Sequence, residues 1–378
     1  MEPTRRTPPI RIRCEPLTPV WTGDAGGQGG RTRETGLIGS LRWWYEGILR
    51  GCGFYACDPS AGTCVYEDKR GLAGICLACQ LFGCTGYARR FRLEVEGGSG
   101  AGELLPVRLK NPGVADHRGW RVPKSLTNPF TLKILPLYPK TMDTGGLSLT
   151  LALIERFGAF GAKTSHGQGV VRFGDLPMPP AVTEWIAGRK QLPAKAAAGS
   201  QSNMPDVRDL VGATISISSP QAAWWKALRV RDGDLQAFGL SSTLRWVPTA
   251  PVIRAMLRAE LRGTSIPSND RHRLMGTIQR WADPRPEIKD GKPRDRTKAS
   301  DVFVTHAYRF DDAWRMRIFA FIPRGGGVAD QRMRTLLGDQ GQLQSKVAAA
   351  LSLATGDVAV TPFPRTVEQM LTGSEDGA

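Results

Sequence analysis

Residues 34–50 read ETGLIGSLRWWYEGILR and form the most regularly patterned segment of the chain. Its apolar residues recur at intervals of three and four, so they share one face of a helix: Leu37, Leu41, Trp44 or Tyr45, Ile48 and Leu49. Gly51 follows, and glycine commonly ends helices. The pattern predicts an amphipathic helix with Trp44 in a core. Arg42 and Trp43 lie beside the apolar stripe and are free to face a ligand.

Strand-like and helix-like patterns alternate on both sides of this helix. Strands are expected at 10–14, 87–95, 104–109 (pairing with 87–95), 130–137, 170–173, 244–247, 302–309 and 314–322, and helices at 147–157, 182–188, 250–262 and 332–353. Strand, helix, strands, helix and strand in each half predict an α+β fold of two ferredoxin-like (RRM-like) units. We expect a first domain at 1–180 with a cysteine insertion at 52–85, a linker at 181–206, and a second domain at 207–378.

The chain of 378 residues is strongly basic, with a net charge of +16 and a pI near 9.9. A positive charge of this size favours a polyanionic partner, because each phosphate that is neutralised releases condensed counterions. Nucleic acid is the expected partner, and anionic lipid is the alternative. Ten tryptophans add surfaces on which bases stack, although we expect Trp224, Trp225 and Trp281 to be core residues.

The distribution of apolar residues argues against a membrane protein. No stretch approaches the roughly 20 consecutive apolar residues that a membrane helix needs. The N-terminal segment MEPTRRTPPIRIRC is basic but contains no apolar region of the signal-peptide type. We therefore expect a cytoplasmic protein without a membrane partner.

The seven cysteines carry the most specific chemical signal. An odd number without a secretion signal argues against a disulfide framework. Cys76 and Cys79 form a Cys-x-x-Cys pair, and a second pair, Cys57 and Cys64, which lacks that spacing, would complete a tetrahedral zinc site. A structural Zn²⁺ would also supply folding energy to a glycine-rich insertion. Cys52 and Cys84 are competing ligands, and separately buried thiols are the alternative.

Residues 158–169, GAFGAKTSHGQG, form a glycine-rich segment. The segment follows an expected helix and precedes an expected strand, the reverse of the order in dinucleotide-binding motifs. Its backbone amides suit a nucleic-acid backbone, and the alternative is a plain surface loop. The candidate RNA-binding side chains are Arg31, Arg33, Arg42, Trp43, Arg50, Arg89, Lys163, Ser165, His166 and Gln168.

Motifs spread along the chain resemble the RAMP superfamily of type III CRISPR systems. TPVWTG (18–23) leading into RETGLIGSLRWWYE (33–46) resembles the N-terminal signature of that family. CLACQLFGCTG (76–86) followed by ARRFRL (88–93) is similar to its Leu-Phe-Gly segment, and FGAFGAKTSHGQGVVR (157–172) to its glycine-rich loop. In the second half VPTAPVIR (247–254), RHRLMG (271–276), HAYR (306–309) and WRMRI (314–318) add to the likeness. The combination most resembles the RAMP proteins of the type III-B (Cmr) complex.

This resemblance implies a specific biological role. It implies two fused ferredoxin-like folds that cap the effector filament at the 3′ end of the guide RNA. It also implies help in capturing target RNA beside other Cmr subunits, with cleavage left to another subunit.

Two rival functions remain from the residues. A RAMP endoribonuclease that processes CRISPR precursor RNA needs a general base, usually a histidine. Only His166 lies in a segment expected to face RNA, and no second histidine accompanies it. We therefore expect no catalytic centre, with metal-free cleavage by Asp24 as the remaining route. A free-standing zinc-bearing RNA-binding protein is the second rival, and it leaves the joint arrangement of the motifs unexplained.

Overall fold

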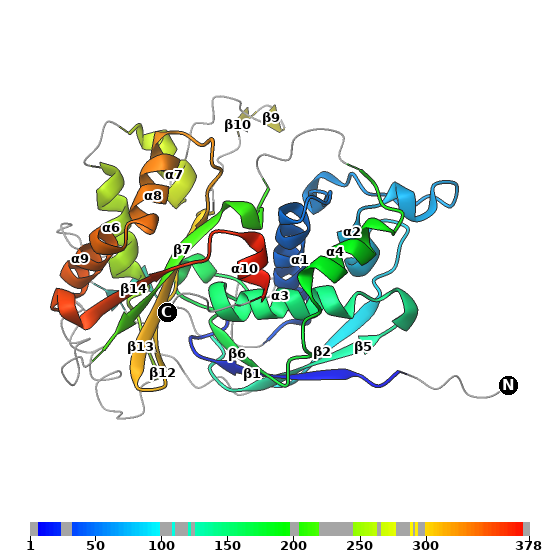
Figure 1. Cartoon of the computed structure of the whole chain (residues 1–378), viewed down its shortest axis with the longest axis horizontal. Coiled ribbons are helices and arrows are strands. Elements are labelled where there is room, and N and C mark those ends of the chain that lie inside the picture. The colour runs from blue at the N-terminus through cyan, green and yellow to red at the C-terminus, as the bar shows by residue number, and fades with distance from the viewer. Residues whose placement is uncertain are drawn as a thin grey trace.

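Two sheet-and-helix units lie side by side in the structure, which is a computed structural model (Figure 1). It describes residues 7–23, 32–98, 108–109, 120–121, 125–196, 204–218, 245–262, 266–276, 288–289, 292–293 and 299–372. The predictions for Asp24, Arg31, Trp224, Trp225 and Trp281 lie outside these residues. No helix in the described part of the chain has the length and apolar character needed to cross a bilayer.

The first unit contains a four-stranded antiparallel sheet in the order β2-β5-β1-β6. Its strands are β1 (Ile10–Pro16), β2 (Phe91–Gly97), β5 (Phe130–Pro136) and β6 (Val171–Gly174). Helices α1 (Glu34–Gly51) and α3 (Thr144–Phe157) pack together over this sheet (Figure 1). This order of strands and helices is the ferredoxin-like arrangement, as predicted.

The second unit repeats the arrangement around a larger sheet. The main path runs β14-β7-β13-β12-β8, and β11 also pairs with β13. Its strands are β7 (Leu210–Ile217), β8 (Trp246–Val247), β11 (Val302–Val304), β12 (Ala307–Phe310), β13 (Ala313–Phe321) and β14 (Val358–Pro362). Its helices are α6 (Ala250–Arg262), α7 (Ser268–Met275), α8 (Val328–Gly338) and α9 (Gln340–Leu351). The α+β fold with two ferredoxin-like units is therefore confirmed.

The remaining elements are short. They are α2 (Leu77–Phe82), α4 (Val182–Lys190), α10 (Val367–Thr372), and the strand pairs β3 (Arg108–Leu109) with β4 (Trp120–Arg121) and β9 (Ile288–Lys289) with β10 (Lys292–Pro293). The expected pairing of 104–109 with 87–95 is wrong for Arg108 and Leu109, which pair with β4 instead.

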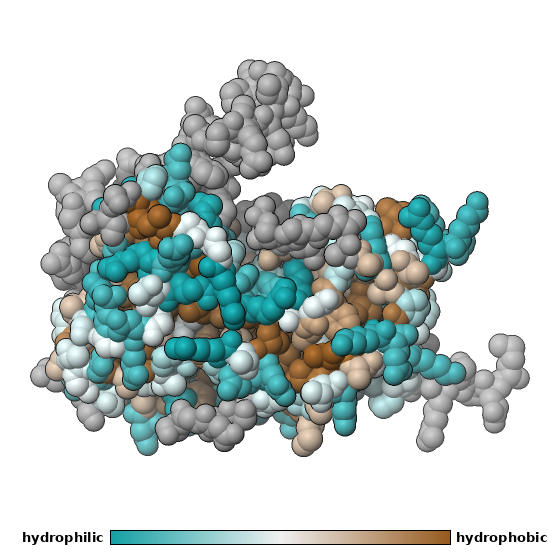
Figure 2. Space-filling view, turned by 45° about the horizontal axis from the view of Figure 1, so that its top comes forward, coloured by the Kyte–Doolittle hydropathy of each residue, from teal (hydrophilic) through white to brown (hydrophobic). Residues whose placement is uncertain are grey.

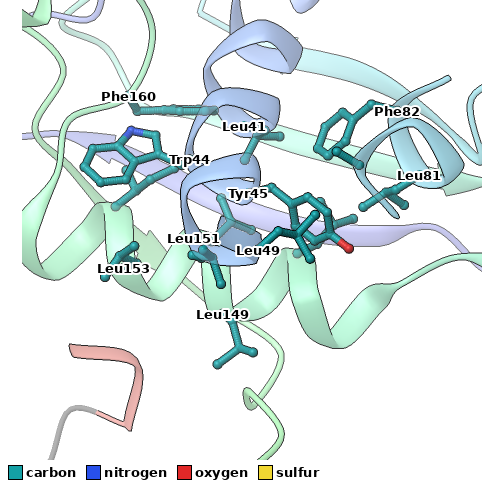
Figure 3. Packing of buried hydrophobic residues seen from close by; sticks show 14 of the residues in the cluster. Leu41, Trp44, Tyr45, Leu49, Leu81, Phe82, Leu149, Leu151, Leu153 and Phe160 are labelled. Atoms are coloured by element: carbon teal, nitrogen blue, oxygen red, sulfur yellow. The ribbon is translucent and has the colours of Figure 1, made fainter. Parts of the chain in front are cut away.

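Helix α1 carries the core of the first unit. Leu41, Trp44, Tyr45 and Leu49 are almost completely buried, as the helical periodicity predicted for that face. Figure 3 shows Trp44 on the side of Phe160 and Tyr45 on the side of α2, with α3 below both. Burying a large side chain of this kind contributes about 1.5–3 kcal/mol, so this helix face dominates the local stability.

Aromatic side chains join the two units. Trp43 packs edge-on against Phe321 at a ring-centroid distance of 5.0 Å and against Phe303 at 6.0 Å. The ring centroid of Trp44 lies 6.0 Å from that of Phe319, which belongs to β13 like Phe321. The doubled tryptophan of α1 is therefore shared between the core of its own unit and the boundary with the second.

A buried arginine of β13 crosses the same boundary. Arg317 donates hydrogen bonds from Nη1 to the carbonyl oxygen of Gly158 (2.9 Å) and from Nη2 to that of Glu155. These carbonyls lie at the C-terminal end of α3, where helical hydrogen bonding leaves oxygens without partners and the helix dipole favours a cation. Arg317 therefore fixes the second unit to the end of a helix in the first.

Two segments depart from the expected organisation. The predicted helix at 332–353 is wrong at Asp339, whose carboxylate accepts from the backbone of Gln342 and starts a new helix, α9. The expected linker contains α4, and Trp185 of this helix donates to Asp143 at 3.0 Å within the first unit. The end of the chain also returns to the first unit, because α10 packs on α3. The division at 181–206 stays a prediction.

Removal of the Arg317 guanidinium tests the coupling of the units. In Arg317→Met the aliphatic stem remains, but the α3 carbonyls lose a charged donor, so we expect a loss of about 2–3 kcal/mol in the free energy of unfolding. Chemical denaturation measures this loss. Arg309→Met, at an exposed position of β12, is the control and should change stability little. Equal effects of the two substitutions would contradict a bridging role.

Candidate metal centre and nucleic-acid interface

Four cysteine sulfurs meet in the insertion between α1 and β2. The Sγ atoms of Cys57, Cys64, Cys76 and Cys79 all lie within 4.8 Å of one another, and all four residues are buried. None of the seven cysteines forms a disulfide. These are the four residues that the spacing favoured, whereas Cys52 and Cys84 are only half-buried and lie outside the group.

The spacing of the sulfurs fits a tetrahedral metal ion. Sulfurs at about 2.3 Å from a zinc ion stand roughly 3.8 Å apart along a tetrahedral edge. The Sγ of Cys57 lies 3.5 Å from that of Cys79 and 3.7 Å from that of Cys76. A disulfide would need about 2.05 Å, so this geometry suits four separate ligands around one cation.

Local structure brings the two pairs of cysteines together. Cys76 begins α2 and Cys79 lies in its first turn, so both sulfurs face one side. The backbone N–H of Cys76 donates to the Sγ of Cys64 at 3.4 Å. Lys195 also contacts the insertion. Its backbone N–H donates to the carbonyl oxygen of Ile75, and its ammonium donates to the carbonyl oxygen of Thr63 at 2.6 Å. The insertion is thus held to the chain at several points.

The four thiols share protons unequally. Hydrogen bonds from Cys57, Cys64 and Cys79 lower the pKa of Cys76 far below that of an ordinary thiol. The hydrogen bond to Cys76 raises the pKa of Cys57 correspondingly. Thiolates are the sulfur form that binds a metal, so a cation that binds there displaces the thiol protons. Metal affinity accordingly falls as the pH is lowered.

Arg42 supplies positive charge beside the sulfurs. Its Nη2 donates to the Sγ of Cys79 at 3.2 Å, its Nη1 to the carbonyl oxygen of Gly83 at 3.1 Å, and its Nε to Glu46 at 2.7 Å. Arg50, also buried, donates to the carbonyl oxygens of Ala56 (3.0 Å) and Cys57 (3.2 Å). Two of the predicted RNA-binding arginines, Arg42 and Arg50, therefore face the cysteine insertion in this structure.

Metal content tests the cluster directly. We expect one divalent metal ion per purified chain, and its loss in Cys79→Ser, because three thiolates bind far more weakly than four. Cys52→Ser is the matched control and should retain the metal. Elemental analysis measures the stoichiometry, and thermal melting with and without a chelator measures the stability that the metal adds. A metal-free wild type that melts at the same temperature with chelator would exclude the site.

The glycine segment forms a tight turn locked to the Thr-Pro loop. Gly169 donates to the carbonyl of Pro19 at 2.9 Å, and Ala162 to that of Trp21 at 2.8 Å. The Nε1 of Trp44 donates to the carbonyl of Ala159 at 3.0 Å. The Thr-Pro loop and the glycine segment, which are more than a hundred residues apart in the sequence, thus form one structural unit. Helix α1 contacts this unit through Trp44.

The tip of the turn presents a cation and a histidine. Lys163 has left-handed backbone geometry (φ 54°), and its ammonium lies 4.0 Å from the ring centre of Trp21. His166 is exposed at the end of a 3-10 turn, Thr164–His166, with Ser165 between them. Desolvation, together with the positive charges of Arg254, Lys163 and Arg258, lowers the pKa of His166 to about 4. His166 is therefore neutral at pH 7 in a positive environment.

Behind the turn lie two buried polar side chains. Gln168 accepts from Ser125 at 2.9 Å, while its Nε2 makes no hydrogen bond within the described part of the chain. His306 lies against Gly167, where φ is 105° and a Cβ would stand 2.4 Å from the imidazole ring. The backbone N–H of His306 donates to the carbonyl of Gly167 at 2.9 Å. The second unit therefore supports the turn, and glycine is required at 167.

Acidification tests the burial of His306. Burial lowers its pKa from 6.5 to about 3, so the folded state keeps it neutral while the unfolded chain binds a proton below pH 6.5. Stability is therefore unaffected above pH 6.5 and decreases as the pH falls from 6.5 toward 3. In His306→Asn this decrease should be shallower, because the contribution of His306 is removed while those of the other titratable groups remain. Denaturation at several pH values measures the slope, His272→Asn controls for histidine replacement, and parallel curves for His306→Asn and wild type would contradict the assignment.

The other predicted RNA-binding residues are dispersed. Trp43 packs at the unit boundary. Arg33 caps the N-terminus of α1, and its backbone N–H donates to the hydroxyl of Thr22 at 2.7 Å. The Nε of Arg89 donates to the carbonyl oxygen of Phe91 at 2.8 Å. A positive stretch of α6 was not predicted: Arg254, Arg258 and Arg262. Its signal in the sequence is a repeat at four-residue intervals.

Comparisons with known proteins support the identity of the first unit. The family model of the RAMP superfamily matches residues 13–172. No curated protein matches the chain. Among solved structures, the crystal structure of Cmr1 from Pyrococcus furiosus in its apo form is 12% identical, with a TM-score of 0.39, over 85% of this chain and 92% of that one. A chain from a cryo-EM structure of the type III-B Cmr-beta complex bound to cognate target RNA and AMPPnP is 11% identical, with a TM-score of 0.43, over 92% of this chain and 100% of that one.

The residues matched by the family model include the sheet, the helices and the loops that contact one another in the first unit. It begins within β1 and ends within β6, the two neighbouring strands of the sheet. Between them lie the Thr-Pro loop, α1, the cysteine cluster and the glycine turn. Residues 13–172 therefore match the RAMP superfamily as one structural unit.

Proposed function

We propose that this chain is an RNA-binding structural subunit of a type III-B (Cmr) CRISPR effector complex, corresponding to its first subunit. In this role it caps the guide at its 3′ end and helps to capture target RNA in antiviral defence, in the cytoplasm. The observation that carries the proposal is the match to the RAMP superfamily over a unit whose glycine turn is locked to the Thr-Pro loop.

The proposed RNA contacts begin at the glycine turn. Lys163, Ser165 and His166 lie at its tip, and Arg33 and Arg89 remain candidates at the edges of the first unit. Arg42 and Arg50 contact the insertion, Trp43 packs at the unit boundary, and Gln168 lies behind the turn. A net charge of +16 makes phosphate binding favourable and strongly dependent on salt.

We propose Zn²⁺ as the ion of the cysteine cluster. Four sulfur ligands in a closed, buried, tetrahedral arrangement are typical of structural zinc, which adds folding energy and takes no part in chemistry. The ion would hold the insertion against α1 through Cys57, Cys64, Cys76 and Cys79.

We propose that the chain leaves RNA intact. A general base works best with a pKa near the operating pH. The pKa of His166 is lowered to about 4, which makes it a weak base, and the buried His306 has no access to a substrate. The exposed position of His166 is the one observation that favours a RAMP endoribonuclease instead.

RNA binding by the purified chain tests the function. We expect it to bind a single-stranded oligoribonucleotide with an affinity that falls steeply with salt, and to leave the RNA intact on a denaturing gel. Lys163→Gln should reduce the slope of log affinity against log salt by about 0.7, the value for one phosphate contact on a single strand. Lys190→Gln, at the exposed end of α4, is the matched control.

Two outcomes would change the proposal. Cleavage that disappears in His166→Ala would make the chain a nuclease. Purification of the chain from cells, followed by sequencing of its bound RNA, identifies its partners. Recovery of the chain without neighbouring subunits or CRISPR RNA would favour the free-standing RNA-binding protein.

A further inference from the structure

Helix α6 carries a row of three arginines along one side. Arg254, Arg258 and Arg262 follow one another at four-residue intervals, so their side chains share one stripe of the helix. Each step along the stripe is about 6 Å, four residues at 1.5 Å rise. Arg254 is buried, Arg258 is half-buried and Arg262 is exposed, so the row runs from the interior to the surface.

Like charges in one row repel each other, and the structure does not relieve the repulsion at its outer end. Glu260, the acid of α6, pairs with Arg332 at 3.3 Å and with Lys346 at 2.5 Å. Within the part of the chain that the structure describes, no carboxylate pairs with Arg258 or Arg262. Repulsion between neighbours adds to desolvation in lowering the pKa of Arg258. Such a row is stabilised by an external anion.

The inner end of the row meets the glycine turn. Arg254 donates from Nη1 to the carbonyl of Val302 in β11 (2.9 Å), and β11 packs against the 3-10 turn that ends at His166. Arg254 and Arg258 both donate to the carbonyl of Met275, at 2.8 and 3.4 Å. Their positive charges contribute to the lowered pKa of His166. The inner end of the row therefore lies close to the turn, across the boundary between the units.

We propose that the sugar–phosphate backbone of a single-stranded RNA bound at the glycine turn continues onto α6, where Arg258 and Arg262 bind successive phosphates. This inference rests on the proposed RNA-binding function and adds the second unit to the binding surface. Guanidinium groups suit phosphate because they present planar, paired donors. Phosphate contacts of this kind fix the register of the strand and carry no sequence preference.

The fixed placement of the units makes such a continuous contact possible. Arg317 ties β13 to the end of α3, and His306 holds Gly167 from behind. The arginine row therefore does not need to move toward the turn when RNA binds. A surface that is already arranged avoids part of the ordering cost of binding.

Charge removal on α6 tests this track. In Arg258→Gln/Arg262→Gln the slope of log affinity against log salt for a labelled oligouridylate should fall by about 1.4, which corresponds to two phosphate contacts on a single strand. Arg309→Gln/Arg365→Gln removes the same charge from exposed positions on β12 and before α10, and should change the slope far less. Arg258→Lys/Arg262→Lys should retain most of the slope, because the charge remains.

The outcomes separate the track from the proposed function. If the wild type does not bind the oligouridylate, the proposed function fails. If the wild type binds and the two double Gln variants behave alike, RNA binding stands and the track on α6 is excluded. Because Arg258 makes internal hydrogen bonds, Arg262→Gln alone provides a variant at an exposed position, with an expected change of about 0.7 in slope. An unchanged slope in that variant, with unchanged melting, would also exclude the track.

Discussion

The C-terminal half of helix α1 lies between the first sheet, the cysteine insertion and the second unit, and this constraint organises the molecule. Its Leu41, Trp44 and Leu49 fill the core over the first sheet, while Arg42 and Arg50 turn toward the cysteine insertion. Trp43 contacts the second unit. A charged residue on such a helix must find partners inside the protein, because burying an unpaired charge is costly. Glu46 lies between the two arginines for this reason, 2.7 Å from Arg42.

Burial of α1 also explains which parts of the site the sequence predicts. Helical periodicity identified the core face correctly, because that signal depends on spacing alone. The same argument placed Arg42 and Trp43 outside the core stripe and therefore toward a ligand. In the structure Arg42 contacts the insertion and Trp43 packs against the second unit, so both side chains have partners within the protein. Only the tertiary structure shows what covers the flanks. The four cysteines, in contrast, were found by local spacing, since a metal site needs particular ligands close together.

The second unit was harder to derive from the sequence. The hairpin of β12 and β13 and helix α6 were predicted from periodicity, yet the central strand β7 was not. The strand does alternate, with buried Ala213, Ile215 and Ile217 between half-buried Thr214 and Ser216, but the alternation extends over only a few residues and was not recognised in the sequence. The arginine row on α6 is visible in the sequence as a four-residue repeat. The repeat alone does not show that Glu260, the acidic residue of α6, forms its ion pairs with other helices. Arg332 and Lys346 supply that information only in three dimensions.

Figure 2 shows hydrophilic side chains over much of the second unit, with more apolar residues reaching the surface toward the first. A basic surface alone would bind many polyanions. The glycine turn and α6 belong to different units, and contacts of Arg317 and His306 hold these units together. The positive groups of the two units therefore have a fixed relative position. These two residues make no proposed contact with RNA, yet the shape of the positive surface depends on them. Burial keeps His306 neutral, so it adds no charge to a region that already contains Lys163, Arg254 and Arg258. The structure thus separates the residues that shape the surface from those that provide its charge.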